Sequence, residues 1–254
     1  MGAQDLHGRV AVVTGASRGI GRAVALRLAE AGADVAAVAR SQEALASLAA
    51  DVSGLGRRCA AIACDVTAED APERVRESVL NEFGRVDILI NNAGGNSFMT
   101  SLEAMRPTGW RKTMLLNLDA TAMLTQALLP GLTEHGNSAI VNVASVAGLR
   151  GAPLMAHYGA AKAALISLTQ SLAIEVAHKG VRVNALVPGW IATDLTGFLR
   201  ADGEAERGVL SRVPMARWGE SAEIAEAALF LASDSSSFMT GQVLIVDGGL
   251  SAMP

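Results

Sequence analysis

The chain has 254 residues, of which half are hydrophobic and 18% are charged, and its formal net charge is −4. This length and apolar content suit one α/β domain with a large buried core. The slight negative charge, without a long run of Lys or Arg, gives no electrostatic support for nucleic-acid binding. Segment 1–8 has no apolar core of a signal peptide, and no uninterrupted apolar run reaches the roughly 18–20 residues of a membrane span. We therefore predict no contact with a membrane.

The chain has two cysteines, Cys59 and Cys64, which lie in one predicted strand segment. Their spacing is not that of a metal site, so we predict buried, reduced thiols and no metal ion. Reduced thiols are typical of a reducing compartment, and we expect the protein in the cytoplasm.

Short apolar runs alternate regularly with longer helical patterns. In chain order we expect a strand at 9–14, a helix at 20–31, a strand at 34–39, a helix at 41–52, a strand at 60–64, a helix at 71–83, a strand at 86–90, a long helix at about 110–132, a strand at 139–143, a helix at 156–177, a strand at 181–187, a helix at 222–232 and a strand at 243–246. Several strands are continuous apolar runs, as in parallel sheets covered on both faces. The pattern predicts a single α/β domain over 1–254, a doubly wound Rossmann fold with about seven parallel strands.

Segment 190–220 breaks this alternation, because it contains several glycines, charged residues and Pro214. Long insertions between regular elements are often functional, and we expect this one to form a lid over the substrate. Loops 96–99 and 149–155 and the first part of the insertion, 190–210, are expected to line the substrate pocket. They mix Met, Leu, Phe and Trp with few charges, which favours a substrate with an apolar portion.

A glycine-rich turn follows the first predicted strand and opens the first predicted helix. Gly15, Gly19 and Gly21 allow a tight turn and a close approach of backbone N–H groups to a phosphate. The N-terminus of the helix adds a dipole that favours negative charge. The turn therefore predicts a dinucleotide site, and an ordinary glycine-rich loop is the alternative.

Tyr158 is the only tyrosine of the chain, and Lys162 lies four residues later on the same face of a predicted helix. An ammonium group beside a phenol is expected to lower the phenol pKa from roughly 10. Such a phenol can donate a proton to a carbonyl oxygen or remove one from an alcohol. The alternative is a structural tyrosine with a solvated lysine.

Five motifs, in order along nearly the whole chain, resemble those of the short-chain dehydrogenase/reductase family. They are G-x-x-x-G-x-G at 15–21, Asn91-Asn92-Ala93-Gly94, Ser145, Tyr158-x-x-x-Lys162, and Pro188-Gly189 with Thr193. Stretches 217–234 and 241–249 are similar to the 3-oxoacyl-(acyl-carrier-protein) reductase-like branch. The resemblance implies hydride transfer between a nicotinamide and a carbonyl or secondary alcohol, with a 3-oxoacyl thioester as one candidate substrate. It does not fix the substrate.

The resemblance also implies roles for individual residues. Tyr158 exchanges the proton, Ser145 orients the substrate oxygen, and Lys162 tunes the phenol and binds the nicotinamide ribose. Asn117, in the middle of a predicted helix, holds a water that links Lys162 to solvent; a buried amide at a helix kink is the alternative. The expected cofactor-binding residues are Gly15, Ser17, Arg18, Gly19, Ile20, Gly21, Arg40, Ser41, Asp65, Val66, Asn92, Ala93, Gly94, Tyr158, Lys162, Pro188, Gly189, Ile191 and Thr193.

The end of the second predicted strand indicates the cofactor. An NAD site usually has an acidic residue there for the ribose 2′-hydroxyl, whereas this chain has Arg40 and Ser41. Together with Arg18 of the glycine turn, Arg40 would pair with a 2′-phosphate, so we predict NADP(H) in preference to NAD(H). Alternatively, Arg40 is solvated or stacks on the adenine. Asp65 and Val66 are expected at the adenine, unless Asp65 only caps the next turn.

Helix 156–177 is apolar around most of its circumference, which favours a buried subunit contact. The resemblance implies a homotetramer, with a homodimer as the alternative. Three other functions are compatible with the pattern: an oxidoreductase of another small ketone, sugar or steroid alcohol, a catalytically silent NADP(H)-binding regulator, and a sugar-nucleotide epimerase. The presence of both Tyr158 and Lys162 disfavours the regulator, and the glycine spacing disfavours the epimerase.

Overall fold

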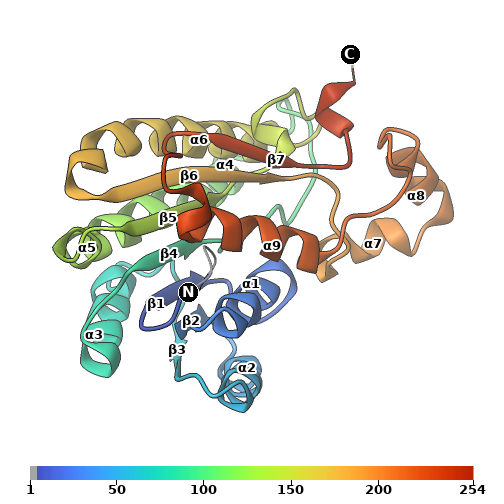
Figure 1. Ribbon diagram of the computed structural model, residues 1–254. Coiled ribbons are helices and arrows are strands. Elements are labelled where there is room, and N and C mark those ends of the chain that lie inside the picture. The colour runs from blue at the N-terminus through green and yellow to red at the C-terminus, as the bar shows by residue number, and fades with distance from the viewer. Residues whose placement is uncertain (1–4, 254) are drawn as a thin grey trace.

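The computed structural model of the protein describes residues 5–253. Residues 1–4, half of the segment on which the signal-peptide expectation rests, and residue 254 lie outside them. A seven-stranded parallel sheet in the order β3-β2-β1-β4-β5-β6-β7 forms the centre of the fold (Figure 1). Its strands are β1 Val10–Thr14, β2 Asp34–Ala39, β3 Cys59–Ala63, β4 Ile88–Asn91, β5 Ser138–Val143, β6 Val181–Pro188 and β7 Val243–Val246.

Helices cover both faces of this sheet. One face carries α1 Gly19–Glu30, α2 Gln42–Gly54 and α9 Ser221–Ala232, and the other carries α3 Ala71–Phe83, α4 Pro107–Met114, α5 Ala120–Glu134 and α6 Ala156–Val176 (Figure 1). Every residue of β1 and β2 is buried, as expected for apolar strands between two helical layers. The prediction of a single α/β domain with a doubly wound parallel sheet is confirmed, and the strand boundaries agree within two residues.

The strand order positions the functional site. The chain runs outward in one direction through β1, β2 and β3 and in the other through β4 to β7, so the order reverses between β1 and β4. In such sheets the carboxyl ends of the two central strands leave a crevice for a ligand. The carboxyl ends of β1 and β4 are Thr14 and Asn91, and the glycine turn follows Thr14 directly.

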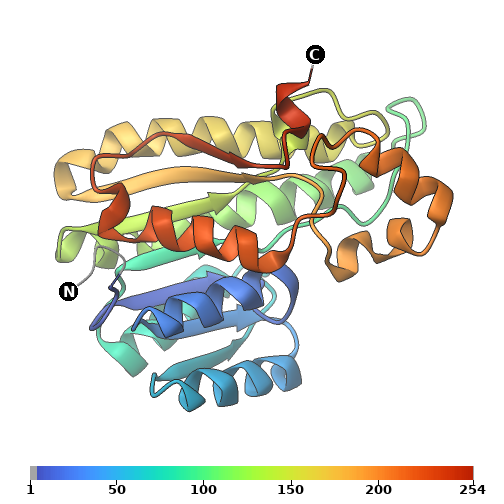
Figure 2. The same cartoon turned by 45° about the vertical axis from the view of Figure 1, so that its right-hand side comes forward.

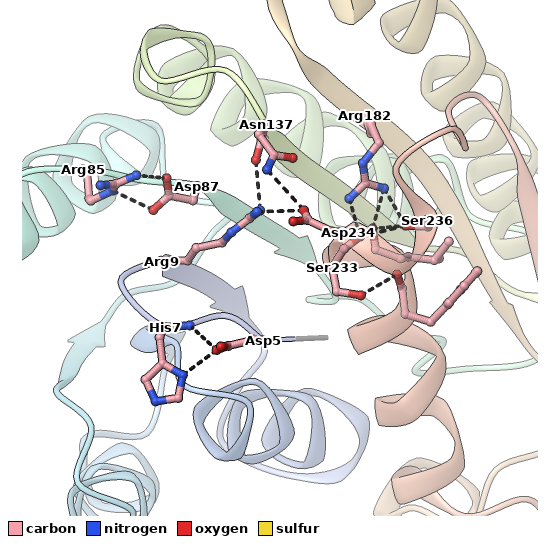
Figure 3. Close-up of polar contacts among 12 residues, drawn as sticks. Asp5, His7, Arg9, Arg85, Asp87, Asn137, Arg182, Ser233, Asp234 and Ser236 are labelled. Atoms are coloured by element: carbon pink, nitrogen blue, oxygen red, sulfur yellow. Dashed lines mark hydrogen bonds and ion pairs between the residues drawn. The ribbon is translucent and has the colours of Figure 1, made fainter. Parts of the chain in front are cut away.

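The opposite, amino-terminal edge of the sheet is closed by a polar cluster (Figure 3). Arg9, just before β1, donates to the carbonyl of Asn137 (3.0 Å) and to Asp234 Oδ1 (2.8 Å). Arg182 of β6 donates to the carbonyl of Leu231 (2.8 Å) and to Ser236 Oγ (2.7 Å). These bonds tie β1, β5 and β6 to the end of α9, and they stabilise the sheet on the side away from the crevice.

The expected long helix at 110–132 is interrupted in the structure. The helical run starts at Pro107 and ends at Glu134, but residues Leu115–Asp119 between α4 and α5 form a π-helical turn. A π-turn accommodates one extra residue per turn and is frequent at functional sites. The single helix was therefore the wrong interpretation at its centre, because sequence periodicity merges three consecutive helical pieces.

The insertion after β6 is folded and contains short helical elements. It contains a 3-10 turn at Asp194–Thr196, α7 Gly197–Arg200 and α8 Gly203–Leu210. Figure 2 shows α7 and α8 extending to one side of the sheet beyond α9. The base of the insertion is closed by a β-bridge between Ile191 and Gly219, and the Trp190 and Trp218 rings meet edge-on at 6.0 Å. Its role as a lid stays a prediction.

Residues Ala156–Lys179, which comprise α6 and the turn after it, are long and apolar enough to cross a membrane by length and composition alone. Buried helices of other proteins meet the same criterion. Here α6 packs lengthwise on β6 and on the π-helical turn, which is the arrangement of a helix that covers a sheet. Ile174 on its outer face is 81% exposed, so part of the apolar surface has no cover within the chain.

Cys59 lies in β3 and is half-buried, whereas Cys64 follows that strand and is buried; both are free thiols. Burial raises the pKa of Cys59 to about 11, which disfavours the reactive thiolate. Within residues 5–253, no three His, Cys, Asp or Glu side chains lie close enough together to hold a metal ion.

Candidate active site

A cleft of about 980 Å3 lies at the carboxyl edge of the sheet, between the glycine turn, the ends of β4 and β5, α6 and the insertion. Its volume is at the upper end of the range for small-molecule and cofactor sites. All the expected site residues line this cleft except Ser41 and Asn117. The structure therefore brings together side chains that lie up to about 180 positions apart in sequence, from Gly15 to Thr193.

The glycine turn packs tightly against the loop after β4. Gly15 and Gly19 have φ of +66° and +54°, which favours glycine at both positions. A Cβ on Gly21 would lie 2.3 Å from the Gly15 carbonyl oxygen and 2.5 Å from Asn92 Nδ2, so no larger residue fits there. Asn92 Nδ2 donates to the Thr14 carbonyl at 2.9 Å and fixes the two loops to each other at the point where the strand order reverses.

The N-terminus of α1 opens onto this turn. Arg18 occupies the N-cap position in an extended conformation and makes no side-chain capping bond, so no side chain at that cap bonds the first N–H groups of the helix. Free N–H groups at a helix N-terminus are a favourable environment for phosphate. The Arg18 guanidinium instead contacts Asp194 of the insertion, with 3.3 Å between Nη1 and Oδ2.

At the far end of the cleft, Arg40 ends β2 and is exposed. Asp65 accepts hydrogen bonds from the backbone and the hydroxyl of Thr67, which lower its pKa. Ser41 does not line the cleft, because its hydroxyl accepts from the backbone N–H of Ala44 and caps α2. Ser41 thus caps α2 in this structure, and its contact with the cofactor stays a prediction.

Tyr158 and Lys162 lie one helical turn apart on α6, and Ser145 follows β5 directly opposite. Burial raises the pKa of Tyr158, and a hydrogen bond with Ser145 opposes that shift. The phenol is therefore protonated at neutral pH and can act as a proton donor. Ser145 Oγ also accepts the backbone N–H of Ala147 at 3.2 Å, which leaves its own hydroxyl proton for the bond with the Tyr158 phenol.

The expectation that Lys162 lowers the phenol pKa is wrong for this arrangement. Lys162 Nζ donates to the Val143 carbonyl at 2.8 Å and lies 5.8 Å from the centre of the Tyr158 ring. Lys162 is itself only 3% exposed, and burial lowers its pKa to about 8. Burial therefore dominates the pKa shift of both groups.

Asn117 lies in the π-helical turn and is 1% exposed. Its amide oxygen accepts the Gly95 N–H at 2.9 Å, and its amide nitrogen donates to the Gly95 and Thr113 carbonyls, each at 3.0 Å. A Cβ on Gly94 would lie 2.8 Å from Asn117 Oδ1 and 3.2 Å from Lys162 Nζ. The arrangement matches the alternative interpretation, a buried amide at a helix irregularity, and it holds the loop after β4 beside the lysine.

Several lining residues were not anticipated from the sequence. Lys112, Thr113, Leu115 and Leu116 enter the cleft from the end of α4 and the π-helical turn. No local signal distinguishes them from other helix residues, because their exposure to the cleft depends on where the π-turn shifts the helical register. Asp194, which pairs with Arg18, also lines the cleft.

The reversal of strand order at a glycine turn, with a half-buried phenol and a buried ammonium group in the same cleft, is the arrangement of an α/β oxidoreductase that uses a dinucleotide. Comparison with known proteins makes the class more specific. A family model described as enoyl-(acyl carrier protein) reductase, of the short-chain dehydrogenase type, matches residues 15–251. The chain belongs to the short-chain dehydrogenase/reductase family and is an enzyme of that family.

The chain is similar to 3-oxoacyl-(acyl-carrier-protein) reductase FabG from Thermotoga maritima, with 40% identity over 96% of this chain and 98% of the relative. It is similar in structure to a putative NAD(P)-dependent gluconate 5-dehydrogenase from Beutenbergia cavernae with bound NADP, at 39% identity and a TM-score of 0.94 over 99% of this chain and all of the other. A gluconate 5-dehydrogenase from Burkholderia cenocepacia, in complex with NADP and tartrate, has 35% identity and a TM-score of 0.94 over 99% of this chain and 98% of the other.

Proposed function

We propose that the protein transfers a hydride between NADP(H) and a ketone or secondary alcohol, and that its carbonyl substrates are 3-oxoacyl thioesters. The observation that carries the proposal is the position of Tyr158, Ser145 and Lys162 in one cleft with the glycine turn. When bound, the nicotinamide supplies or accepts the hydride. The proton is transferred to or from the substrate oxygen by side chains of this chain.

In the direction of reduction, the Tyr158 phenol donates its proton to the substrate oxygen, and Ser145 donates a hydrogen bond to the same oxygen. The pKa of Tyr158 is raised by burial, so the proton is present at neutral pH. Two donors aimed at an oxygen that gains negative charge stabilise the transition state more than the ground state. Lys162, which lines the cleft and bonds the Val143 carbonyl, would hold the ribose hydroxyls of the cofactor.

The residues of the cleft fit a dinucleotide with a 2′-phosphate. Gly15, Gly19 and the uncapped N-terminus of α1 would hold the pyrophosphate. Arg18 and Arg40 line the cleft and would pair with the 2′-phosphate. The bound NADP of the Beutenbergia and Burkholderia proteins supports NADP(H) for this chain, with NAD(H) as the weaker cofactor.

The proposed substrate class rests on exposed apolar side chains in three segments that flank the cleft, of which Leu195 itself lines the cleft. Large apolar side chains that are at least 39% exposed come from the loop after β4, the loop before α6 and the insertion: Met99, Leu102, Leu149, Leu154, Leu195 and Phe198. An acyl chain would bury this apolar surface, whereas a polyol would leave it exposed to water. The name of the Thermotoga relative supports the thioester. A keto-sugar acid is the second candidate, because two structural neighbours are described as gluconate 5-dehydrogenases.

The test is the consumption of NADPH, followed by its absorbance, with acetoacetyl thioesters of increasing chain length and with a keto-gluconate. We expect the thioesters to be reduced, with kcat/KM rising with chain length, and Tyr158→Phe to abolish reduction while NADPH still binds. Reduction of the keto-gluconate alone would replace the substrate assignment. Tight NADPH binding without turnover of any carbonyl would favour the catalytically silent regulator.

The protein is also proposed to be a homotetramer. Ile174 of α6 and Met123 of α5 are 81% and 49% exposed, and Phe238 and Ile245 also expose apolar side chains, so apolar surface on both helices and around β7 lacks cover among residues 5–253. Two distinct self-complementary patches are what a tetramer with dihedral symmetry uses, and one patch would support a dimer. Light scattering at micromolar concentration is expected to give four times the mass of the chain, and a monomer would contradict both assemblies.

The cytoplasm is the proposed location. The free thiols of Cys59 and Cys64 fit a reducing compartment. Fractionation of cells that produce the full chain is expected to recover it with the soluble cytoplasmic proteins, and recovery in the membrane fraction would contradict this placement.

A further inference from the structure

We propose that His157 is a positioning residue that holds the loop after β4 at the substrate side of the cleft. This inference rests on the proposed function. His157 is the second residue of α6 and is fully buried, directly before Tyr158. Its Nε2 lies 3.0 Å from Asn96 Oδ1, and its ring stacks on Phe98 with 4.4 Å between centroids and 10° between planes. One side chain of the catalytic helix thus contacts two residues of the loop.

The loop is held at both ends by other parts of the site. At its start, the Gly95 backbone is bonded to the Asn117 amide in both directions. At its end, the Thr100 N–H donates to the Leu154 carbonyl at 2.9 Å. Between these points, the contacts with His157 fix the middle of the loop. Phe98, which His157 contacts, and Ser97, which lies between the two contacted residues, line the cleft.

The His157 imidazole is suited to a hydrogen bond whose role is to hold the loop after β4 in place. Burial lowers the pKa of His157, so the ring is neutral at physiological pH. The Nδ1 atom is buried and has no hydrogen-bond partner among residues 5–253. The ring bonds Asn96, and the Phe98 backbone partly opposes the effect of burial on its pKa, whereas an apolar ring would pack there without any unpaired atom. The proton of the neutral ring is placed on Nε2, facing the Asn96 oxygen.

The contacts of His157 with the loop determine where the substrate binds in the cleft. Phe98 is wedged between the His157 ring and Gly109 of α4, where an added Cβ would lie 3.0 Å from the Phe98 ring edge. The loop wall facing the carbonyl therefore moves with the helix turn that carries Tyr158. These contacts keep the substrate carbonyl aligned with the Tyr158 phenol. The cofactor-binding residues of the glycine turn take no part in them.

Two substitutions separate the hydrogen bond from the stack. His157→Phe keeps an aromatic ring on Phe98 and removes Nε2, whereas His157→Gln places an amide N–H near Nε2 and removes the ring. For the best carbonyl substrate, we expect His157→Phe to raise KM roughly five- to tenfold, the size of one lost hydrogen bond, with NADPH affinity unchanged. We expect His157→Gln to restore most of the wild-type KM. His178→Gln, at an exposed histidine beyond the end of α6, is the matched control and is expected to have no effect.

A wild-type KM in His157→Phe would overturn the proposal, and so would an equal loss of NADPH affinity, since that is the result of general damage to the core. If His157→Phe does not fold, Asn96→Ala leaves the helix intact and is expected to give the same rise in KM. If the wild type reduces no carbonyl, the proposed function fails, and amide hydrogen exchange over residues 95–100 decides the positioning role. Exchange there is expected to be faster in His157→Phe and Asn96→Ala and slow again in His157→Gln; equal protection in all three would overturn it.

Discussion

Arg18 of the glycine turn and Asp194 of the insertion form an ion pair, with 3.3 Å between Nη1 and Oδ2. Their side chains are 68% and 67% exposed, so the pair is weak and easily exchanged for another partner. Thr193 reaches the same turn, where a Cβ on Gly19 would lie 3.4 Å from its methyl carbon. The insertion thus contacts the phosphate end of the cleft through the guanidinium that is expected to bind the 2′-phosphate.

Asp194 therefore competes with the cofactor for Arg18. We expect Asp194→Asn to raise the affinity for NADPH by about two- to fivefold at low salt, because an exposed pair is worth up to roughly 1 kcal/mol. The gain is expected to shrink as salt screens both interactions. Fluorescence titration with NADPH measures it, and NADH, which has no 2′-phosphate, is the control. A gain of the same size for NADH would show that Asp194 acts on the insertion and not on the phosphate site.

Arg40 is predicted to set the preference for NADP(H). It is exposed at the end of β2, lines the cleft and forms no ion pair with any of the residues 5–253. Charge-assisted bonds to a phosphate are worth about 1.5–3 kcal/mol, so Arg40→Asp is expected to reduce kcat/KM for NADPH by roughly tenfold or more. The new carboxylate is expected to improve NADH through the ribose 2′-hydroxyl. An unchanged ratio of NADPH to NADH would assign Arg40 to the solvated surface.

Asp34 at the start of β2 is expected to contribute to the stability of the sheet. Burial would raise its pKa, but hydrogen bonds from the backbone and side chain of Arg58 and the charge of Arg57 outweigh burial and hold the pKa below 3.8. A folded-state pKa below the unfolded one means that this stabilisation is present above pH 3.8 and is lost as the pH falls through the folded value.

The matching variant is Asp34→Asn. At neutral pH it is expected to lower the free energy of unfolding by about 1–3 kcal/mol, because the Arg57 and Arg58 donors lose the largely buried charged acceptor that they share. The difference from wild type is expected to shrink in acid, as the pH falls below 3.8 and Asp34 becomes protonated in the folded chain. Urea unfolding at neutral pH and in acid measures it. A difference that persists in acid would mean that the amide disturbs packing instead.

The sequence predicted the strands well, because each is an apolar run that a parallel sheet buries on both faces. The glycine turn and the Tyr158–Lys162 pair were also found, since their spacing is local. Three other features could not be predicted from the sequence, and the physical reason is the same for each. The π-turn that holds Asn117, the bond of Lys162 to the Val143 carbonyl, and the contact of Arg18 with Asp194 all depend on how distant segments pack. Local periodicity carries no information on such pairs.

Buried Lys162 is expected to lower the free energy of unfolding of the chain. Its pKa falls from the ordinary 10.5 to about 8 because it is buried, so folding disfavours the bound proton. The unfolded chain then binds more protons than the folded one between pH 8 and 10.5, and stability rises with pH over that range. A pKa shift of this size corresponds to a loss of roughly 3 kcal/mol of folding free energy at neutral pH.

Lys162→Met, studied without cofactor, tests this directly. The apolar side chain removes the cost of the buried charge but leaves the Val143 carbonyl without its donor, a loss of about 1 kcal/mol. We expect a net gain of about 2 kcal/mol in the free energy of unfolding at pH 7, with carbonyl reduction abolished. The gain is expected to shrink as the pH is raised from 8 towards 10, where wild-type Lys162 is already neutral. Urea unfolding across this range measures it, and a variant less stable than wild type at pH 7 would show that the lysine is held charged in a better-solvated site.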